Sequence, residues 1–175
     1  AIVSPDEKTK KRIDYLKNFG FADEVTVVAP GINGKMNEFQ AAVGLAQLKH
    51  MDSVFAEREG IDRRYRELLA DVPGIGCPPP PSSRRHNYSY FPILVDSEYP
   101  LSRDELYDRL RINGIYARRY FYPLISEFPM YRALASAKAA NLAEASSLSA
   151  RVIALPIYPG LPESVLQTLA NLIRN

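Results

Sequence analysis

Asn33 and Lys35 lie in a glycine-bearing loop directly before an expected helix start. Asn37 is the expected cap of that helix, and Gln40 follows it at the spacing of a reciprocal capping pair. A loop before a helix start offers backbone N–H donors and the positive end of the helix dipole to an anion. Together with the amide of Asn33 and the ammonium of Lys35, this segment could bind a phosphate group. From spacing alone, however, we favour a simpler interpretation, a turn in which Asn33 satisfies backbone groups.

A second group of cations and aromatic rings could bind an anionic or flat ligand. The cations are Arg84, Arg85, Arg118 and Arg119, and the rings are Tyr116, Tyr120, Phe121 and Tyr122. Tyrosine combines an apolar ring with a hydroxyl group, which suits a pocket for a sugar or a base. The alternatives are an ordinary charged surface and the aromatic core of a strand, and spacing alone favours them.

Other residue types argue against an independent hydrolase or metalloenzyme. His50 and His86 are the two histidines, and neither lies beside a nucleophile motif or a set of metal ligands. Cys77 is the single cysteine, so no internal disulfide can form. The net charge of +2 is too small to predict nucleic-acid binding, and no apolar run is as long as a membrane span. We therefore expect no metal, no nucleic acid and no membrane as partners.

The first part of the chain predicts two helices separated by a short strand. Ser4 caps the first expected helix, which ends near residue 20, and residues 25–28 form a β-type run. Apolar residues then repeat at helical spacing over residues 37–69. A helix of that length suggests a connection between two domains, bent at Gly60.

The second part of the chain alternates between strand and helix patterns. Strands are expected at residues 88–95, 115–121 and 152–157, and helices at 102–112, 129–148 and from Pro162 onward. Pro92 marks the first of these strands as an edge or bulged strand. The alternation predicts an α+β layer domain, in which helices cover a small sheet.

Four segments, in this order along the chain, resemble the DegT/DnrJ/StrS aminotransferase family. The first is residues 1–6, the third is 114–124, and the fourth is 155–161. The second carries the most specific motif, made of Gly31, Asn33, Lys35, Met36, Glu38, Gln40, Ala41, Ala42, Gly44, Gln47 and Leu48. The resemblance therefore covers essentially the whole chain.

This resemblance implies a pyridoxal-phosphate enzyme that aminates keto sugars attached to nucleotides, with glutamate as the expected amino donor. Its fold would be the α/β architecture of fold type I aminotransferases. Residues 1–40 would close the large cofactor domain, and residues 41–175 would form the bridging helix and the small C-terminal domain. The enzyme would be a cytoplasmic homodimer.

The resemblance also implies roles for individual residues. Asn33 would reach the cofactor phosphate of the neighbouring subunit, and Lys35 would add positive charge beside it. The residues expected to line the substrate side are Arg118, Tyr120 and Tyr122.

The catalytic lysine of this family, which binds pyridoxal phosphate covalently, precedes the segment that residues 1–6 resemble. We therefore expect the chain to be a piece of a longer enzyme, without a catalytic residue of its own and inactive alone. Two alternatives stay open. One is a non-catalytic remnant or dimerisation module, and the other is a sugar dehydratase of the same fold, which the residue at the lysine position would distinguish.

Overall fold

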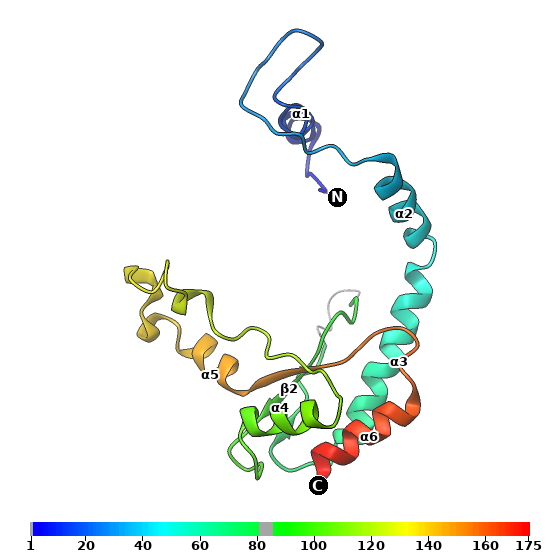
Figure 1. Cartoon of the computed structure of the whole chain (residues 1–175), viewed down its shortest axis with the longest axis vertical. Coiled ribbons are helices and arrows are strands. Elements are labelled where there is room, and N and C mark those ends of the chain that lie inside the picture. The colour runs from blue at the N-terminus through cyan, green and yellow to red at the C-terminus, as the bar shows by residue number, and fades with distance from the viewer. Residues whose placement is uncertain (1, 81–85) are drawn as a thin grey trace. The chain divides into compact units, whose positions relative to one another are not determined.

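The computed structural model describes residues 2–80 and 86–175, and the chain divides into two compact units, residues 1–50 and 51–175 (Figure 1). The anion site predicted at Arg84 and Arg85 lies outside the described residues.

Helix α1 (Glu7–Leu16) opens the first unit, and it begins later than the sequence predicted. Its cap is Asp6, whose carboxylate accepts hydrogen bonds from the backbone N–H and the hydroxyl of Thr9 at 2.8 and 2.9 Å. The prediction that Ser4 caps this helix is therefore wrong. An ionised carboxylate is as good a cap as a serine hydroxyl and also interacts favourably with the helix dipole.

The loop after α1 does not contain the strand predicted at residues 25–28. Val27 makes an isolated bridge with Phe21, and no longer ladder forms. The carboxylate of Asp23 accepts hydrogen bonds from the backbone N–H groups of Val25 and Thr26 at 3.0 and 2.9 Å. These local bonds close a tight turn and take donors that a strand would need.

The helical pattern of residues 37–69 is divided between two helices, α2 (Glu38–Leu48) and α3 (Met51–Leu69). The break falls at Lys49 and His50, whose N–H groups bond three residues back, to Ala46 and Gln47, at 3.3 and 2.9 Å. The prediction of one helix bent at Gly60 is therefore wrong, since Gly60 lies inside α3. The spacing of apolar residues could not reveal the break, because these residues continue at helical spacing on both sides of it.

The sheet of the second unit has three antiparallel strands in the order β1 (Ile75–Gly76), β2 (Phe91–Val95) and β3 (Val152–Leu155). Phe91 lies opposite Leu155, and Ile93 lies opposite Ile153. The strand predicted at residues 115–121 is wrong. That segment contributes one isolated bridge, between Arg118 and Ala154.

Pro92 lies on the central strand, although the sequence predicted an edge or a bulge. It pairs with Ala154, whose own N–H and C=O bond Arg118 at 2.7 and 2.9 Å and so point away from β2. The side of Pro92 that lacks an N–H therefore faces β1, which pairs only with residues 94–95 and does not extend that far. Proline is tolerated here because no carbonyl of a described neighbouring strand lies where it would accept a hydrogen bond from an N–H at residue 92.

Helix α4 (Arg103–Ile112) begins as predicted, because Ser102 and Glu105 form a reciprocal capping pair. The alanine-rich stretch at 129–148 is only partly α-helical. It includes the short 3₁₀ turns Ala135–Ala137 and Ala139–Asn141 before α5 (Ala143–Arg151), and another such turn, Ile125–Glu127, precedes it. The last helix, α6 (Glu163–Arg174), follows Pro162 as expected.

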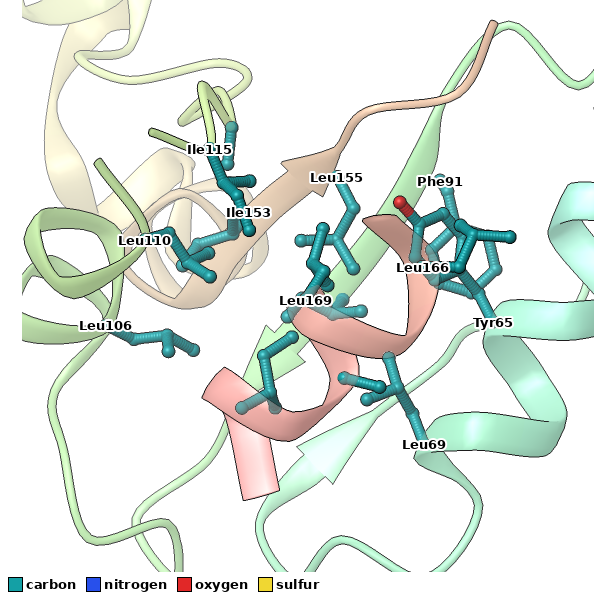
Figure 2. Packing of buried hydrophobic residues seen from close by; sticks show 14 of the residues in the cluster. Tyr65, Leu69, Phe91, Leu106, Leu110, Ile115, Ile153, Leu155, Leu166 and Leu169 are labelled. Carbon is teal, nitrogen blue, oxygen red and sulfur yellow. The ribbon is translucent and has the colours of Figure 1, made fainter. Parts of the chain in front are cut away.

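The core of the second unit lies between the sheet and the helices α3, α4 and α6 (Figure 2). Alternate residues of β2 are buried, as the pleat requires of a strand with one covered face. The fully buried side chains include Tyr65, Leu69, Phe91, Ile93, Leu106, Leu110, Ile153, Leu169 and Ile173. The predicted architecture, a small sheet covered by helices in a mixed α/β fold, is confirmed.

Among the described residues, no helix is both long and apolar enough to cross a membrane.

Candidate functional site

The loop that carries Asn33 and Lys35 is held along the end of α1. The N–H of Ile32 donates to the carbonyl of Leu16 at 2.8 Å, and the N–H of Phe19 donates to the carbonyl of Ile32 at 3.0 Å. The N–H of Gly34 donates to the carbonyl of Lys17 at 2.8 Å. These backbone bonds fix the position of the loop independently of its side chains.

Two glycines permit this close approach. Gly20 has a φ of +87°, in the region that favours glycine, and it forms the turn that follows α1. A Cβ atom at Gly31 would lie 2.3 Å from the backbone nitrogen of Gly20. A side chain at either position would therefore displace the loop and the residues it presents.

Asn33 and Lys35 are both exposed on this loop. The backbone of Asn33 bridges to Asn18, and within the described residues its side-chain amide makes no hydrogen bond. The ammonium of Lys35 donates to the side-chain oxygen of Asn18 at 3.0 Å and lies 5.5 Å from the ring centre of Phe19. Neither contact neutralises its charge. The structure thus brings a free amide and a cation onto one short segment.

The start of α2 is capped by the protein's own side chains. Asn37 accepts a hydrogen bond from the N–H of Gln40 at 2.9 Å, and Gln40 accepts one from the N–H of Asn37 at 3.3 Å. This confirms the predicted capping pair. Glu38 also places a carboxylate in the first turn. Capping therefore uses the N–H groups of Asn37 and Gln40, and the side-chain donors beside this helix start are those of Asn33 and Lys35.

The remaining predicted residues lie in the second unit, where Arg118, Tyr120 and Tyr122 follow the end of α4. The backbone of Arg118 is fixed to β3 by its two bonds to Ala154, and its side chain is exposed. The ring of Tyr120 meets that of Tyr90 edge-on, with 5.4 Å between centres, and stacks on Phe121 at 4.9 Å. These aromatic residues form a surface cluster and not the core strand that was the alternative.

Two guanidinium groups lie near the ring of Tyr122. The central carbon of the Arg103 guanidinium lies 4.5 Å from the centre of this ring, and that of Arg119 lies 5.6 Å away. Arg119 donates to Asp104 at 2.8 Å, and the guanidinium of Arg119 is also 4.4 Å from the ring centre of Tyr107. The hydrogen bond from Arg119 holds the pKa of Asp104 below its ordinary value.

Sequence reasoning missed Arg103 and Asp104. The capping pair around them predicted that they lie in the first turn of α4, but nothing in their spacing showed that they meet Tyr122. That contact depends on how the segment after α4 turns back along the helix.

An apolar cavity of about 470 Å³ lies next to the aromatic cluster, on the side of the sheet away from α6. Its walls include Tyr120, Phe121, Pro92, Leu94 and Val152. Few polar groups face this space, so it does not offer the hydrogen bonds that a sugar or a phosphate needs.

The chain belongs to the DegT/DnrJ/EryC1/StrS aminotransferase family, whose pattern it matches over residues 1–174. This confirms the resemblance found in the sequence.

Individual relatives agree with the assignment. The chain is 53% identical over 173 residues to a dTDP-4-amino-4,6-dideoxy-D-glucose transaminase of Escherichia coli, a match that covers 99% of this chain and 47% of the relative. An enzyme of the same name from Shigella dysenteriae is 42% identical over 174 residues, again covering 99% of this chain and 47% of the relative. The crystal structure of DesV from S. venezuelae superposes with a TM-score of 0.88 at 27% identity, over 98% of this chain and 45% of that one. The chain thus spans about half the length of the relatives it matches.

Proposed function

We propose that this chain is the C-terminal part of a pyridoxal-phosphate-dependent aminotransferase that acts on a nucleotide-linked keto sugar. The observation that carries the proposal is the 53% identity, over nearly the whole chain, to a transaminase named for a dTDP-linked 4-amino sugar. The amino donor would be glutamate. By "intact enzyme" we mean the longer polypeptide that would contain these residues.

Surface exposure in the first unit supports a longer polypeptide. Gly20 is the single buried residue among the described residues of that unit, and Val25, Phe39, Val43 and Leu48 are exposed. A unit that leaves its apolar side chains in water gains little from the hydrophobic effect. We propose that the cofactor domain of the intact enzyme, to which residues 1–40 would belong, covers these side chains, and that 41–175 form the linking helices and the small domain.

The chemistry of Asn33 and Lys35 fits the phosphate group of the cofactor. An amide N–H and an ammonium are both hydrogen-bond donors, and charge-assisted bonds to phosphate are stronger than neutral ones. Asn33 would donate to the phosphate held by the neighbouring subunit of a homodimer, and Lys35 would add positive charge. When bound, pyridoxal phosphate supplies the electron sink for transfer of the amino group.

The second unit would contribute to the binding of the nucleotide sugar. The exposed guanidinium of Arg118 offers two parallel donors to a diphosphate oxygen pair. Tyr120 and Tyr122 present flat rings and hydroxyl groups, which suit contact with a sugar or a base. No residue of this chain is proposed to perform the proton transfers, which the resemblance assigns to a lysine that would lie elsewhere in the intact enzyme.

A product assay tests the proposal. The intact enzyme is incubated with pyridoxal phosphate, glutamate and a dTDP-linked 4-keto-6-deoxyglucose, the ketone that corresponds to the amino sugar in the relatives' name. We expect a dTDP-linked 4-amino sugar and an equal amount of 2-oxoglutarate. A dehydrated sugar without loss of glutamate would instead identify a dehydratase, and no conversion with this or other nucleotide keto sugars would identify a non-catalytic module.

A further inference from the structure

Arg103 is a buried arginine whose contacts are directed toward the proposed substrate side. The residue is 6% exposed, although arginine is rarely buried without a specific partner. One of its terminal nitrogens donates to the carbonyl of Ser149 at 2.9 Å, which ties the start of α4 to α5. This bond fixes the plane of the guanidinium group.

The fixed guanidinium lies over the ring of Tyr122, with 4.5 Å from its central carbon to the ring centre. A cation over an aromatic face is attracted by the ring, and more strongly when water is excluded from one side. Tyr122 itself is half-exposed, with 47% of its surface accessible, and within the described residues its hydroxyl makes no hydrogen bond. The contact therefore holds the ring and leaves the hydroxyl free.

The same arginine begins a chain of charges that reaches Arg119. Its Nε lies 2.9 Å from Asp104 Oδ1, although it is not aligned for a hydrogen bond. That same oxygen accepts from Arg119 at 2.8 Å, and Arg119 in turn lies 5.6 Å from the ring centre of Tyr122. Two cations and one carboxylate thus meet beside the ring, and the carboxylate of Asp108 also acts electrostatically on Arg119.

We infer that Arg103 is a positioning residue, which orients the Tyr122 ring and, through Asp104, the Arg119 guanidinium toward a nucleotide diphosphate sugar. The inference rests on the proposed function, since it assigns this residue to the binding of that substrate. Because its side chain is buried, Arg103 itself would not contact the substrate or the cofactor phosphate. Its effect should therefore appear in sugar binding and not in the reaction with the amino donor.

The test compares Arg103→Met and Arg103→Lys in the intact enzyme with Arg111→Met, a change to an exposed arginine on the same helix. We expect Arg103→Met to raise KM for the nucleotide sugar about tenfold, close to the 1.4 kcal/mol that a moderately desolvated cation–ring contact provides. KM for glutamate and kcat should stay within about twofold, and Arg103→Lys, which keeps the charge, should give an intermediate KM. The Arg111 variant should match the wild type.

A double-mutant cycle with Tyr122→Leu separates positioning from a purely structural role. If Arg103 acts through the ring, Arg103→Met should raise sugar KM clearly less in the Tyr122→Leu background than in the wild type, and the rise that remains would come from the route through Asp104 and Arg119. Equal KM values for the wild type and Arg103→Met, a fall in kcat with both substrates alike, or fully additive effects in the cycle would overturn the inference. Wild-type transamination is measured first, so that its absence counts against the proposed function and not against Arg103 alone. If Arg103→Met does not fold, the Lys variant decides: an unchanged sugar KM with Arg103→Lys rejects the inference.

Discussion

The hydroxyl of Tyr65 donates a 2.8 Å hydrogen bond to the backbone carbonyl of Pro156, which ties α3 to the segment that follows β3. The ring of Tyr65 is fully buried and packs against Phe91, with 4.8 Å between ring centres (Figure 2). One side chain thus joins a helix, a strand and a loop. Removing its hydroxyl leaves a partly buried carbonyl without this partner.

Tyr65→Phe should lower the free energy of unfolding of the chain by about 1 kcal/mol, the usual net value of one hydrogen bond within a protein. Urea unfolding followed by circular dichroism measures this change. Burial also raises the pKa of Tyr65. The wild type should therefore lose stability as the pH rises above about 10, where the unfolded tyrosine ionises and the folded one does not. An alkaline loss of the same size in Tyr65→Phe would show that other groups cause it.

Leu110→Ala should destabilise the second unit by about 2 to 5 kcal/mol, because it leaves a cavity in a fully packed core. Leu110 has no exposed surface, whereas Ile112, two residues later in the same helix, is 85% exposed. Ile112→Ala is therefore the matched control, and its effect should stay within about 0.5 kcal/mol. Similar urea midpoints for the two variants would contradict the assigned core face of α4.

Asp104 should make the second unit more stable above pH 4 than below it. The hydrogen bond from Arg119 lowers the pKa of Asp104 in the folded state. A carboxyl with a lowered pKa contributes stability above its unfolded pKa, and this contribution is lost as the pH falls through the folded value. A carbon-13 NMR titration should place the Asp104 pKa below 3.8, its reference value. In Asp104→Asn, the free energy of unfolding should fall less between neutral and acid pH than in the wild type. An equal fall in the two proteins would argue against this ion pair in solution.

Arg118→Gln should raise KM for the nucleotide sugar in the intact enzyme by about 10- to 100-fold, since a charge-assisted bond contributes about 1.5 to 3 kcal/mol. The backbone bonds of Arg118 to Ala154 do not involve the side chain, so the fold should be kept. KM for glutamate should not change. Arg111→Gln serves as the exposed control, and equal sugar KM values for the two variants would remove Arg118 from the proposed substrate side.

Some local features of this fold could be predicted from the sequence, although the cap at Ser4 and the strand at residues 25–28 were predicted wrongly, and features that depend on distant contacts could not be predicted. The capping pairs at Asn37 and Ser102 need only residues three positions apart, and both are present. Strand β1 has only two residues, which are too few to show the alternation of apolar and polar residues that predicts a strand. It is a strand because it pairs with Leu94 and Val95 of β2, which lie about 20 positions later in the chain.

The candidate sites show the same division. Asn33 and Lys35 could be chosen as candidates from the sequence because they share one short motif. Arg103 and Tyr122 are 19 positions apart in the sequence (103 to 122), and they meet because the chain turns back after α4. No local pattern could reveal that contact.

The central claim is that Asn33 completes a cofactor site whose lysine belongs to the neighbouring subunit. In the intact enzyme, Asn33→Ala should raise the dissociation constant for pyridoxal phosphate about 10- to 100-fold, the range expected for a lost hydrogen bond to a charged group. Asn171→Ala, a change to an exposed asparagine on α6, should leave it unchanged.

Mixing subunits gives the most direct measurement. Asn33→Ala subunits are mixed with subunits that lack the cofactor lysine, and transamination is measured at a pyridoxal phosphate concentration too low to fill the Asn33→Ala site. Random reassociation should give one complete site in half of the dimers, and so about a quarter of the wild-type activity. Activity no higher than that of the two separate variants would contradict the claim.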